Sequence, residues 1–316
     1  GYDVSVIDNF SNSKAESLNR VKKITSKKID LHEGDLCDIA FINQLLSKKK
    51  ISSVIHFAGL KSIEKSFRDP VSYYENNFLA TINLVNAMIH NNITNFIFSS
   101  SATIYGNNKT VPFKEENKFG MSLNPYASTK IMIEQFLMDL CANKNFKAIS
   151  LRYFNPIGAH SSGLIGEDSL EAPSNLMPII SDVAIGKNKY LTIFGNDYKT
   201  RDGTCLRDYF HVMDLADGHL NALKKLESLN GSSIYEAYNL GSGEPKSVIE
   251  IIEAFSAITE KVINYKFGPK RNGDSPEVWA DITKAKKELM WEPKRSLQDM
   301  LIDGWNWKKN NPMGYK

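Results

Sequence analysis

A short run near the middle of the chain combines a helix start with side chains suited to proton transfer: Asn124-Pro125-Tyr126-Ala127-Ser128-Thr129-Lys130. Asn124 is a typical N-cap, and Pro125 suits the first helical position, where its missing N–H costs nothing. Tyr126 then lies in the first turn, with Lys130 four residues on over the same face. The ammonium group and the helix dipole both favour ionisation of a phenol whose ordinary pKa is about 10. The spacing predicts a tyrosine base acting on a hydroxyl, although exposed Tyr–Lys pairs are also common on helices.

Around this run, apolar segments of strand type alternate with segments of helical periodicity. Strands are expected at residues 4–7, 28–31, 51–57, 96–101 and 148–154. Helices are expected at 36–46, at 78–89 and from Tyr126 onward. The alternation predicts an α/β fold with a doubly wound parallel sheet of Rossmann type. Ligands bind at the carboxyl ends of such strands, where five candidate residues stand: Asp8, Asp35, Gly59, Ser101 and Asn155.

The chain has 316 residues, of which 42% are hydrophobic, enough for two domains that share an interface. We expect a Rossmann domain over residues 1–155. We expect residues 156–316 to form mainly a smaller α+β domain, with segments near 207–243 returning to the first domain. Strands in this second half are expected at 190–194, 235–240 and 262–267.

Composition narrows the function classes. The net charge is only +3 and the lysines are scattered, which indicates neither a nucleic-acid nor a membrane partner. No apolar run is long enough to span a membrane. Cys37, Cys141 and Cys205 are far apart and outside any metal-binding spacing, so no metal site is expected. Unpaired cysteines favour a reducing compartment, and we expect a cytoplasmic protein.

An acidic residue that closes the second strand of a doubly wound fold accepts hydrogen bonds from an adenosine ribose and repels a 2′-phosphate, so Asp8 favours NAD over NADP. No glycine-rich phosphate loop precedes it. Because a βαβ unit takes about 30 residues, roughly 20–25 residues with the first strand and that loop are expected to be missing. We therefore expect the chain as given to bind NAD poorly and to be inactive.

Several motifs together resemble the extended short-chain dehydrogenase/reductase superfamily. They are Asp8-Asn9-Phe10-Ser11-Asn12-Ser13, Gly34-Asp35-Leu36, His56-Phe57-Ala58-Gly59-Leu60-Lys61, Ser99-Ser100-Ser101-Ala102-Thr103-Ile104-Tyr105-Gly106 and Pro125-Tyr126-Ala127-Ser128-Thr129-Lys130. Segments of the second half look like the UDP-glucose (UDP-galactose) 4-epimerase family. These are Leu151 to His160, Asn175-Leu176-Met177-Pro178, Phe194 to Tyr198, Asp202 to Val212, and Arg271 to Asp281. The resemblance runs in one order from Gly1 nearly to Tyr315.

The resemblance implies a tightly held NAD that oxidises C4 of a UDP-hexose and returns the hydride to the opposite face of the 4-keto sugar. Tyr126 would take the C4 hydroxyl proton, and Ser101 would hydrogen-bond the same oxygen. Lys130 would lower the pKa of the tyrosine and hold the nicotinamide ribose.

The resemblance also implies two sets of binding residues. The cofactor set is Asp8, Asn9, Asn12, Ser13, Asp35, Leu36, Phe57, Ala58, Gly59, Lys61, Asn76, Ser99, Tyr126, Lys130 and Phe154. The UDP-sugar set is Lys61, Ser101, Tyr126, Asn155, Asn175, Leu176, Phe194, Arg207, Tyr209, Arg271, Asp274 and Val278. Two arginines from separate segments suit a diphosphate. Taken alone, Arg207 and Arg271 would be read as surface ion pairs, and Phe194 and Tyr209 as core aromatics.

One residue departs from the family pattern. Val278 stands directly before Trp279, where epimerases confined to non-acetylated sugars usually carry a tyrosine. The smaller side chain predicts room for a 2-N-acetyl group, unless neighbouring side chains refill the space.

Three alternatives remain open. A sugar-nucleotide dehydratase would typically carry an Asp-Glu pair where this chain has Ala102-Thr103. A decarboxylase or uronate epimerase would share the Tyr–Lys core. A non-catalytic nucleotide-binding fragment is the third. The apolar helix faces at 78–89 and 133–140 fit the homodimer that the resemblance implies, and would equally fit core packing.

Overall fold

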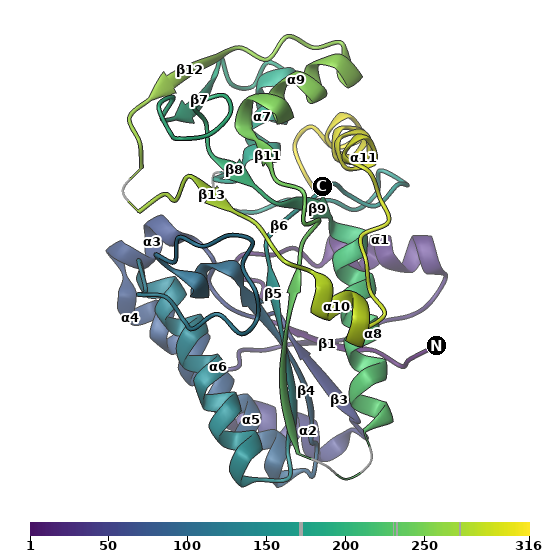
Figure 1. Cartoon of the computed structure of the whole chain (residues 1–316). Helices are drawn as coiled ribbons and strands as arrows, with labels where there is room; N and C mark the ends of the chain where they lie inside the picture. The colour runs from purple at the N-terminus through teal and green to yellow at the C-terminus, as the bar shows by residue number, and fades with distance from the viewer. Residues whose placement is uncertain (171–172, 230, 232, 272) are drawn as a thin grey trace.

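The computed structural model describes residues 1–170, 173–229, 231, 233–271 and 273–316. Its centre is a parallel four-stranded sheet in the order β10-β5-β4-β3 (Figure 1). The strands are β3 (Ser53–His56), β4 (Asn95–Ser101), β5 (Lys147–Tyr153) and β10 (Ile234–Leu240). The predicted α/β fold with a parallel sheet is confirmed. The strand ends differ by one or two residues from those expected, since fraying ends carry little apolar signal.

Alternating side chains of these strands face two cores. Ile97 and Ile149 belong to a core shared with α8 (Val212–Ser228). Phe96, Phe98 and Ala148 belong to a second core on the other face. The helices that fill this second core are α2 (Ile39–Lys48), α5 (Ala80–His90) and α6 (Pro125–Asn143). Burial on both faces explains why these strands read as continuous apolar runs.

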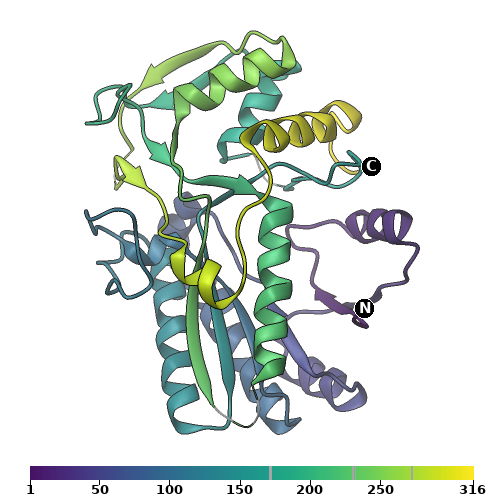
Figure 2. The ribbon, with the colours of Figure 1, turned by 45° about the vertical axis from the view of Figure 1, so that its right-hand side comes forward.

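The N-terminal segment forms a unit of its own beside the sheet (Figure 2). Strands β1 (Ser5–Asp8) and β2 (Asp30–Glu33) pair in parallel, and α1 (Glu16–Thr25) connects them. Among the described strands, no ladder joins this pair to the central sheet. Helix α1 was not expected, because none of its residues is buried and its sequence is mostly polar. The prediction of a missing first strand and loop stays a prediction.

The second half builds a cap over the carboxyl edge of the sheet from short ladders and helices (Figure 1). Strand β6 (Asn155–Ile157) pairs with β9 (Tyr209–His211), and β7 (Leu191–Phe194) pairs with β12 (Tyr265–Gly268). A third sheet has the order β11-β8-β13, with bounds Lys246–Ser247, Leu206–Arg207 and Glu277–Val278. The helices are α7 (Leu176–Ala184), α9 (Val248–Thr259), α10 (Thr283–Glu288) and α11 (Leu297–Asn310). Because α8 and β10 pack with the central sheet, the chain crosses between cap and sheet more than once; the domain boundaries stay a prediction.

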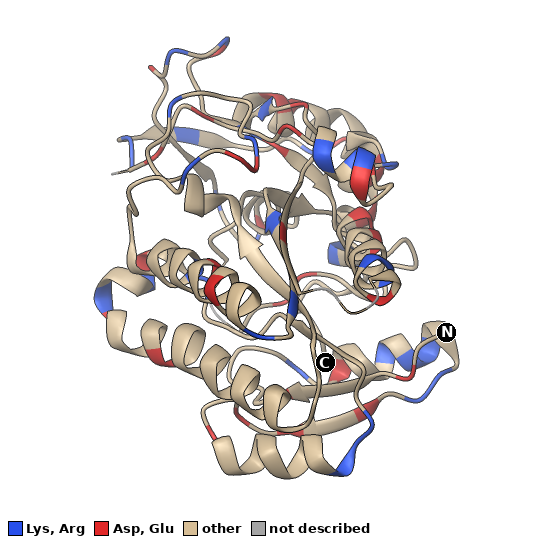
Figure 3. Ribbon diagram, turned by 60° about the horizontal axis from the view of Figure 1, so that its bottom comes forward, with Lys and Arg blue, Asp and Glu red and all other residues tan. Residues whose placement is uncertain are grey.

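The helix expected at 78–89 is confirmed, since its first two residues end a π-helical turn, η1 (Tyr74–Leu79), and α5 follows directly. The short helices before it, α3 (Ile63–Arg68) and α4 (Pro70–Tyr73), were not expected. Asp69 caps α4 and Pro70 occupies its first position, so the chain restarts there. A further 3₁₀ turn, η2 (Ala102–Tyr105), follows β4. Basic and acidic residues are interspersed over the ribbon (Figure 3). None of the described helices combines the length and apolarity that a membrane crossing requires.

Candidate active site

Several of the predicted residues lie at the carboxyl ends of the central parallel strands. β4 ends in Ser99–Ser101 and β5 is followed by Phe154 and Asn155. Register places Ser101 opposite Tyr153 on the neighbouring strand. Helix α6 begins at this same edge, since it returns the chain from β4 to β5. Strand ends and a helix start therefore meet where a ligand can reach both.

The start of α6 has the predicted geometry. The Asn124 side chain accepts a hydrogen bond from the Ala127 N–H at 2.8 Å, and Pro125 occupies the first helical position. These features are confirmed. They fix Tyr126 in the first turn of a helix whose inner face is buried against the sheet.

The charge of Lys130 is used differently from what the spacing suggested. Lys130 is 5% exposed, and its Nζ donates to the Ser99 carbonyl at 2.7 Å. Its Nζ lies 5.8 Å from the centroid of the Tyr126 ring. Burial lowers the pKa of Lys130 to about 8, while the Glu134 carboxylate acts in the opposite direction.

Burial raises the pKa of Tyr126, and a hydrogen bond with the Ser101 side chain acts against that rise. Nearby Tyr73 adds to the rise. This differs from the expected lowering by Lys130, because the ammonium group points to a backbone carbonyl. Ser101 is the side chain that favours the phenolate, and its Oγ also accepts from the Thr103 N–H at 3.2 Å.

The expected adenosine residues lie at the ends of β1 and β2. The Asp8 carboxylate accepts from the Phe10 N–H at 2.7 Å and from Ser13 Oγ at 2.8 Å. The Asn9 amide donates to Asp35 at 2.8 Å, which joins the two strand ends. Leu36 is buried behind Asp35, and Asn12 is exposed in the following turn. The set presents carboxylate and amide oxygens together, as a ribose diol requires.

The loop after β3 is held by a residue that sequence reasoning did not select. The Asn77 side chain accepts from the Leu60 N–H at 2.7 Å and donates to the Leu60 carbonyl at 3.0 Å. Gly59 has φ +150°, and a Cβ there would come 3.0 Å from the Asn77 amide oxygen. The preceding Phe57 and Ala58 are exposed. Asn76, the residue before Asn77, instead donates to the carbonyl of Ser72 in the preceding helix α4. The sequence alone does not indicate that Asn77 is buried and the adjacent Asn76 is not.

In the cap, three predicted residues contact one another through charge. Arg271 Nε lies 2.8 Å from Asp274, and the Arg271 guanidinium stacks 4.9 Å over the Phe194 ring. Arg207 lies 3.6 Å from the other oxygen of Asp274. Two cations thus converge on one carboxylate beside an exposed aromatic ring, an arrangement suited to an anionic group with a planar base.

Further residues expected to bind the UDP-sugar lie on neighbouring strands of the cap or at the start of α7. Register sets Val278 beside Arg207, and Asn155 beside Tyr209. Burial raises the pKa of Tyr209 to about 12, so its hydroxyl stays protonated at neutral pH. Asn175 begins α7 ahead of Leu176, and its amide donates to Glu167 at 2.9 Å.

Asp208 organises this part of the cap, although it was quoted only as part of a motif. Its carboxylate is fully buried and accepts from the N–H groups of Ser242, Gly243 and Ala280. Burial raises its pKa, and these hydrogen bonds oppose the rise. It ties β8 to the segments that follow β10 and β13.

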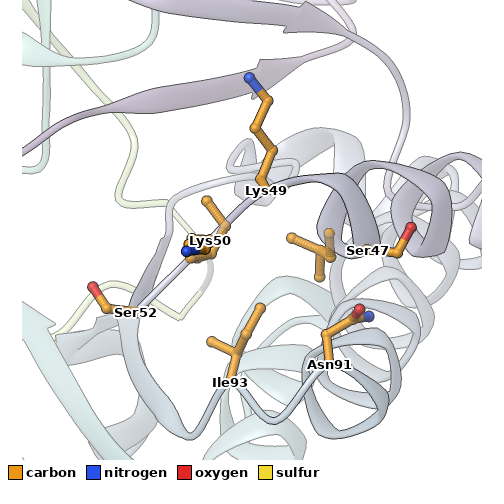
Figure 4. Close-up of a pocket in the computed structure, with 8 residues that line it drawn as sticks. Ser47, Lys49, Lys50, Ser52, Asn91 and Ile93 are labelled. Carbon is orange, nitrogen blue, oxygen red and sulfur yellow. The ribbon is translucent and has the colours of Figure 1, made fainter.

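A separate hollow of about 400 Å³ opens at the other end of the sheet (Figure 4). It is lined by Leu46, Lys50, Ile51, Asn91 and Ile93, which precede β3 and β4. The Lys49 side chain extends from its rim to Asp30. This hollow lies at the amino ends of the strands, away from Tyr126.

Comparisons with known proteins agree with this geometry. Residues 1–303 match the family model of GDP-mannose 4,6 dehydratase. UDP-glucose 4-epimerase of Erwinia amylovora is 48% identical over 99% of this chain and 93% of its own length. The Bacillus subtilis UDP-glucose 4-epimerase is 47% identical over the whole chain and 92% of its own length.

Solved structures give the same result. UDP-glucose 4-epimerase from Bifidobacterium longum, in complex with NAD⁺ and UDP, matches with a TM-score of 0.95 and 41% identity. That match covers all of this chain and 93% of the other. The UDP-Glc/GlcNAc 4-epimerase of Campylobacter jejuni matches with a TM-score of 0.82 and 32% identity, over 98% of this chain and 92% of that one.

Fold and site define a nucleotide-sugar enzyme of the extended short-chain dehydrogenase/reductase class. Within that class, the relatives' identity over nearly the full chain is decisive. The chain belongs to the UDP-glucose 4-epimerase family.

Proposed function

We infer that the protein catalyses the reversible C4 epimerisation of UDP-glucose and UDP-galactose with NAD. The observation that carries the inference is the edge where Ser101, Tyr126 and Lys130 lie, below a cap with two converging arginines. NAD, when bound, would supply the hydride-transfer chemistry at C4. The side chains of the protein bind NAD and the UDP-sugar and transfer one proton.

The residues at the strand ends fit NAD. Asp8 and Asn9 offer acceptors for ribose hydroxyls, and a carboxylate there disfavours a 2′-phosphate. Gly59 has no side chain, so the backbone can come close to a bound group, and Asn77 holds the loop through the Leu60 N–H. Lys130 holds its ammonium group beside β4, within reach of a ribose at this edge.

Tyr126 takes the proton of the C4 hydroxyl as C4 is oxidised, and gives it back when C4 is reduced. Ser101 hydrogen-bonds the phenol and can carry the same proton between the sugar oxygen and the ring oxygen. Because this proton returns to the sugar, no external acid is needed. Arg207 and Arg271 would hold the diphosphate, and Phe194 the uracil, with Asp274, Tyr209, Asn155, Asn175 and Leu176 completing the pocket.

A deuterium experiment tests this reaction against its rival. UDP-galactose is incubated with protein and added NAD in D₂O, and products are followed by NMR. We expect UDP-glucose without deuterium at C4, because the hydride is returned directly. A dehydrated keto sugar would instead support the dehydratase alternative, which Ala102-Thr103 disfavours because neither residue is an acid.

We also propose that UDP-GlcNAc and UDP-GalNAc are substrates. Val278 is a small side chain beside Arg207 in the cap, and the Campylobacter relative is named for both sugars. Val278→Tyr should abolish turnover of the acetylated pair and preserve that of UDP-galactose. No turnover of acetylated sugars by the parent protein would contradict the proposal.

We further propose a homodimer. The helical segment from α3 to α6 exposes a set of apolar side chains: Phe67, Val71, Tyr74, Leu79, Met132 and Met138. A hollow of about 480 Å³ among Val71, Tyr74 and Phe78 can receive a partner's side chain. Light scattering should show a dimer that Leu79→Asp dissociates, while the control Met290→Asp, on an exposed residue elsewhere, leaves it intact.

We also propose a cytoplasmic location, which the three free cysteines support. Extraction of nucleotide from purified protein measures how much NAD the chain holds, and activity measurements contain added NAD.

A further inference from the structure

The C-terminal segment packs two aromatic rings beside the N-terminal unit. Trp307 and Tyr315 have ring centroids 4.7 Å apart and form a buried cluster with Ala159. The Arg20 guanidinium, from α1, lies 4.9 Å from the Tyr315 ring and 5.7 Å from the Trp307 ring. Figure 2 shows α1 next to the C-terminus, although the two are far apart in sequence.

Gly166-Glu167-Asp168, called here the strap, is clamped against these rings. Tyr315 Oη donates to the Gly166 carbonyl at 3.0 Å, and Trp307 Nε1 donates to the Glu167 carbonyl at 3.2 Å. A Cβ on Gly166 would come 2.2 Å from the Trp307 ring, so the backbone has no room for a side chain. The Tyr315 N–H donates to the Asp168 carboxylate at 2.7 Å. The strap is therefore held in one position on the cap.

The same strap reaches the N-terminal unit through charge. Lys14 Nζ lies 2.9 Å from Asp168 and 3.2 Å from the Tyr315 carbonyl. Arg20 donates to the Leu164 carbonyl at 3.0 Å. Lys14 directly follows Ser13, whose hydroxyl donates to Asp8. No ladder among the described strands joins β1 to the central sheet, although Ile7 packs against the core that α2 and α5 fill. Side-chain contacts such as that of Lys14 therefore help to place the Asp8–Ser13 segment.

Through Glu167 the strap also contacts two further segments that are expected to bind ligands. One oxygen of Glu167 accepts from the Asn175 amide at 2.9 Å and lies 3.4 Å from Lys61 Nζ. Lys61 belongs to the loop after β3, and Asn175 precedes α7. Two consecutive carboxylates thus connect three segments that lie far apart in the sequence.

We propose that the strap is a positioning element: Asp168, fixed by Tyr315, sets the adenosine-binding segment through Lys14, while Glu167 aligns Lys61 with Asn175. The assignment of Asp8–Ser13 to adenosine rests on the proposed function; the mechanical link does not. None of the strap residues touches reacting atoms. Their effect is on how well the binding segments are ordered before ligands arrive.

Asp168→Asn tests the link, because the amide keeps an acceptor for Tyr315 and loses the charge that holds Lys14. Hydrogen exchange of the ligand-free protein is measured at the amides of residues 9–19, together with the dissociation constant of NAD. We expect faster exchange there and roughly tenfold weaker NAD binding, with kcat unchanged at saturating NAD and UDP-galactose. The control Glu292→Gln removes an exposed ion pair with Lys286 and should change none of these.

Unchanged exchange and unchanged NAD affinity in Asp168→Asn would overturn the proposal. Tyr315→Phe is a second, milder variant: it keeps the ring under Arg20 and loses only the bonds to Gly166, so it should speed exchange less. Asp8→Ala tests the adenosine-binding role of the Asp8–Ser13 segment separately from the role of the strap. If it leaves NAD binding intact, the adenosine assignment fails, whereas faster exchange in Asp168→Asn would still support the strap.

Discussion

The floor of the active site and the cap above it are held by different kinds of interaction. On the floor, Lys130 is 5% exposed and bonded to a backbone carbonyl, and Tyr126 is fixed by the capped start of α6. In the cap, the Arg271 side chain is 55% exposed and is held mainly by Asp274 and the face of Phe194. The groups proposed to move a proton are thus fixed by secondary structure, and the groups proposed to recognise the substrate are fixed by side-chain charge. Variants on the two sides should therefore fail in different ways.

The largest effect is expected on the floor. Tyr126→Phe removes the proposed proton acceptor and leaves the ring, so kcat should fall about 10²- to 10⁴-fold while UDP-sugar binding stays nearly intact. Steady-state rates give kcat and titration of UDP gives the affinity. Tyr190→Phe, which removes an exposed hydroxyl paired with Lys266, is the matched control. A near-parental rate in Tyr126→Phe would remove this residue from the mechanism.

Cap variants should act on substrate affinity instead. Arg207→Met removes a guanidinium that is largely buried against Asp274, and should raise KM for UDP-galactose roughly tenfold to a hundredfold with a smaller change in kcat. The parental KM should also rise with salt, because ionic screening weakens exposed pairs. Arg201→Met, which breaks an exposed pair with Glu250, is the control. An unchanged KM in Arg207→Met would place the diphosphate elsewhere.

The same contrast explains what the sequence could predict. The alternation of apolar runs was sufficient for the parallel sheet, and Asn124-Pro125 was sufficient for the start of α6, because both signals are local. The contact of Lys130 was not predicted correctly. Its ammonium group donates to the Ser99 carbonyl, and this contact depends on where the β4 ladder ends. Helix α1 has no buried face and so no periodic signal.

Residues that form hydrogen bonds with distant segments of the chain were not identified from the sequence. Asn77 differs from Asn76 only in its direction on a π-helical turn, and Asp208 acquires its partners from segments about 35 and 72 residues away. Buried polar residues of this type become visible only when their backbone partners are known. In the cap, the family resemblance predicted Arg207, Arg271 and Asp274 as binding residues, and the structure shows the ion pairs that join them.

The pH dependence of kcat/KM tests whether the charge of Lys130 is needed for turnover. Burial lowers the pKa of Lys130 to about 8, so its ammonium group is lost as pH rises through that value. If the cation supports Tyr126 and the cofactor, kcat/KM should be roughly tenfold lower at pH 9 than at its plateau. In Lys130→Arg the guanidinium stays charged, and the decline should move to higher pH even if the plateau is lower. The same decline in both proteins would assign it to another group.

The smallest expected effect distinguishes a helix N-cap residue that supports catalysis from one that supports only stability. Asn124→Ala and Ser296→Ala each remove the N-cap of a helix, α6 and α11 respectively. Each should lower the free energy of unfolding by about 1 kcal/mol, measured by urea denaturation. Only Asn124→Ala should also lower kcat, by a few-fold, because fraying of the first turn of α6 displaces Tyr126. An equal loss of kcat in Ser296→Ala would mean that turnover follows global stability, and that the start of α6 has no special part in holding the base.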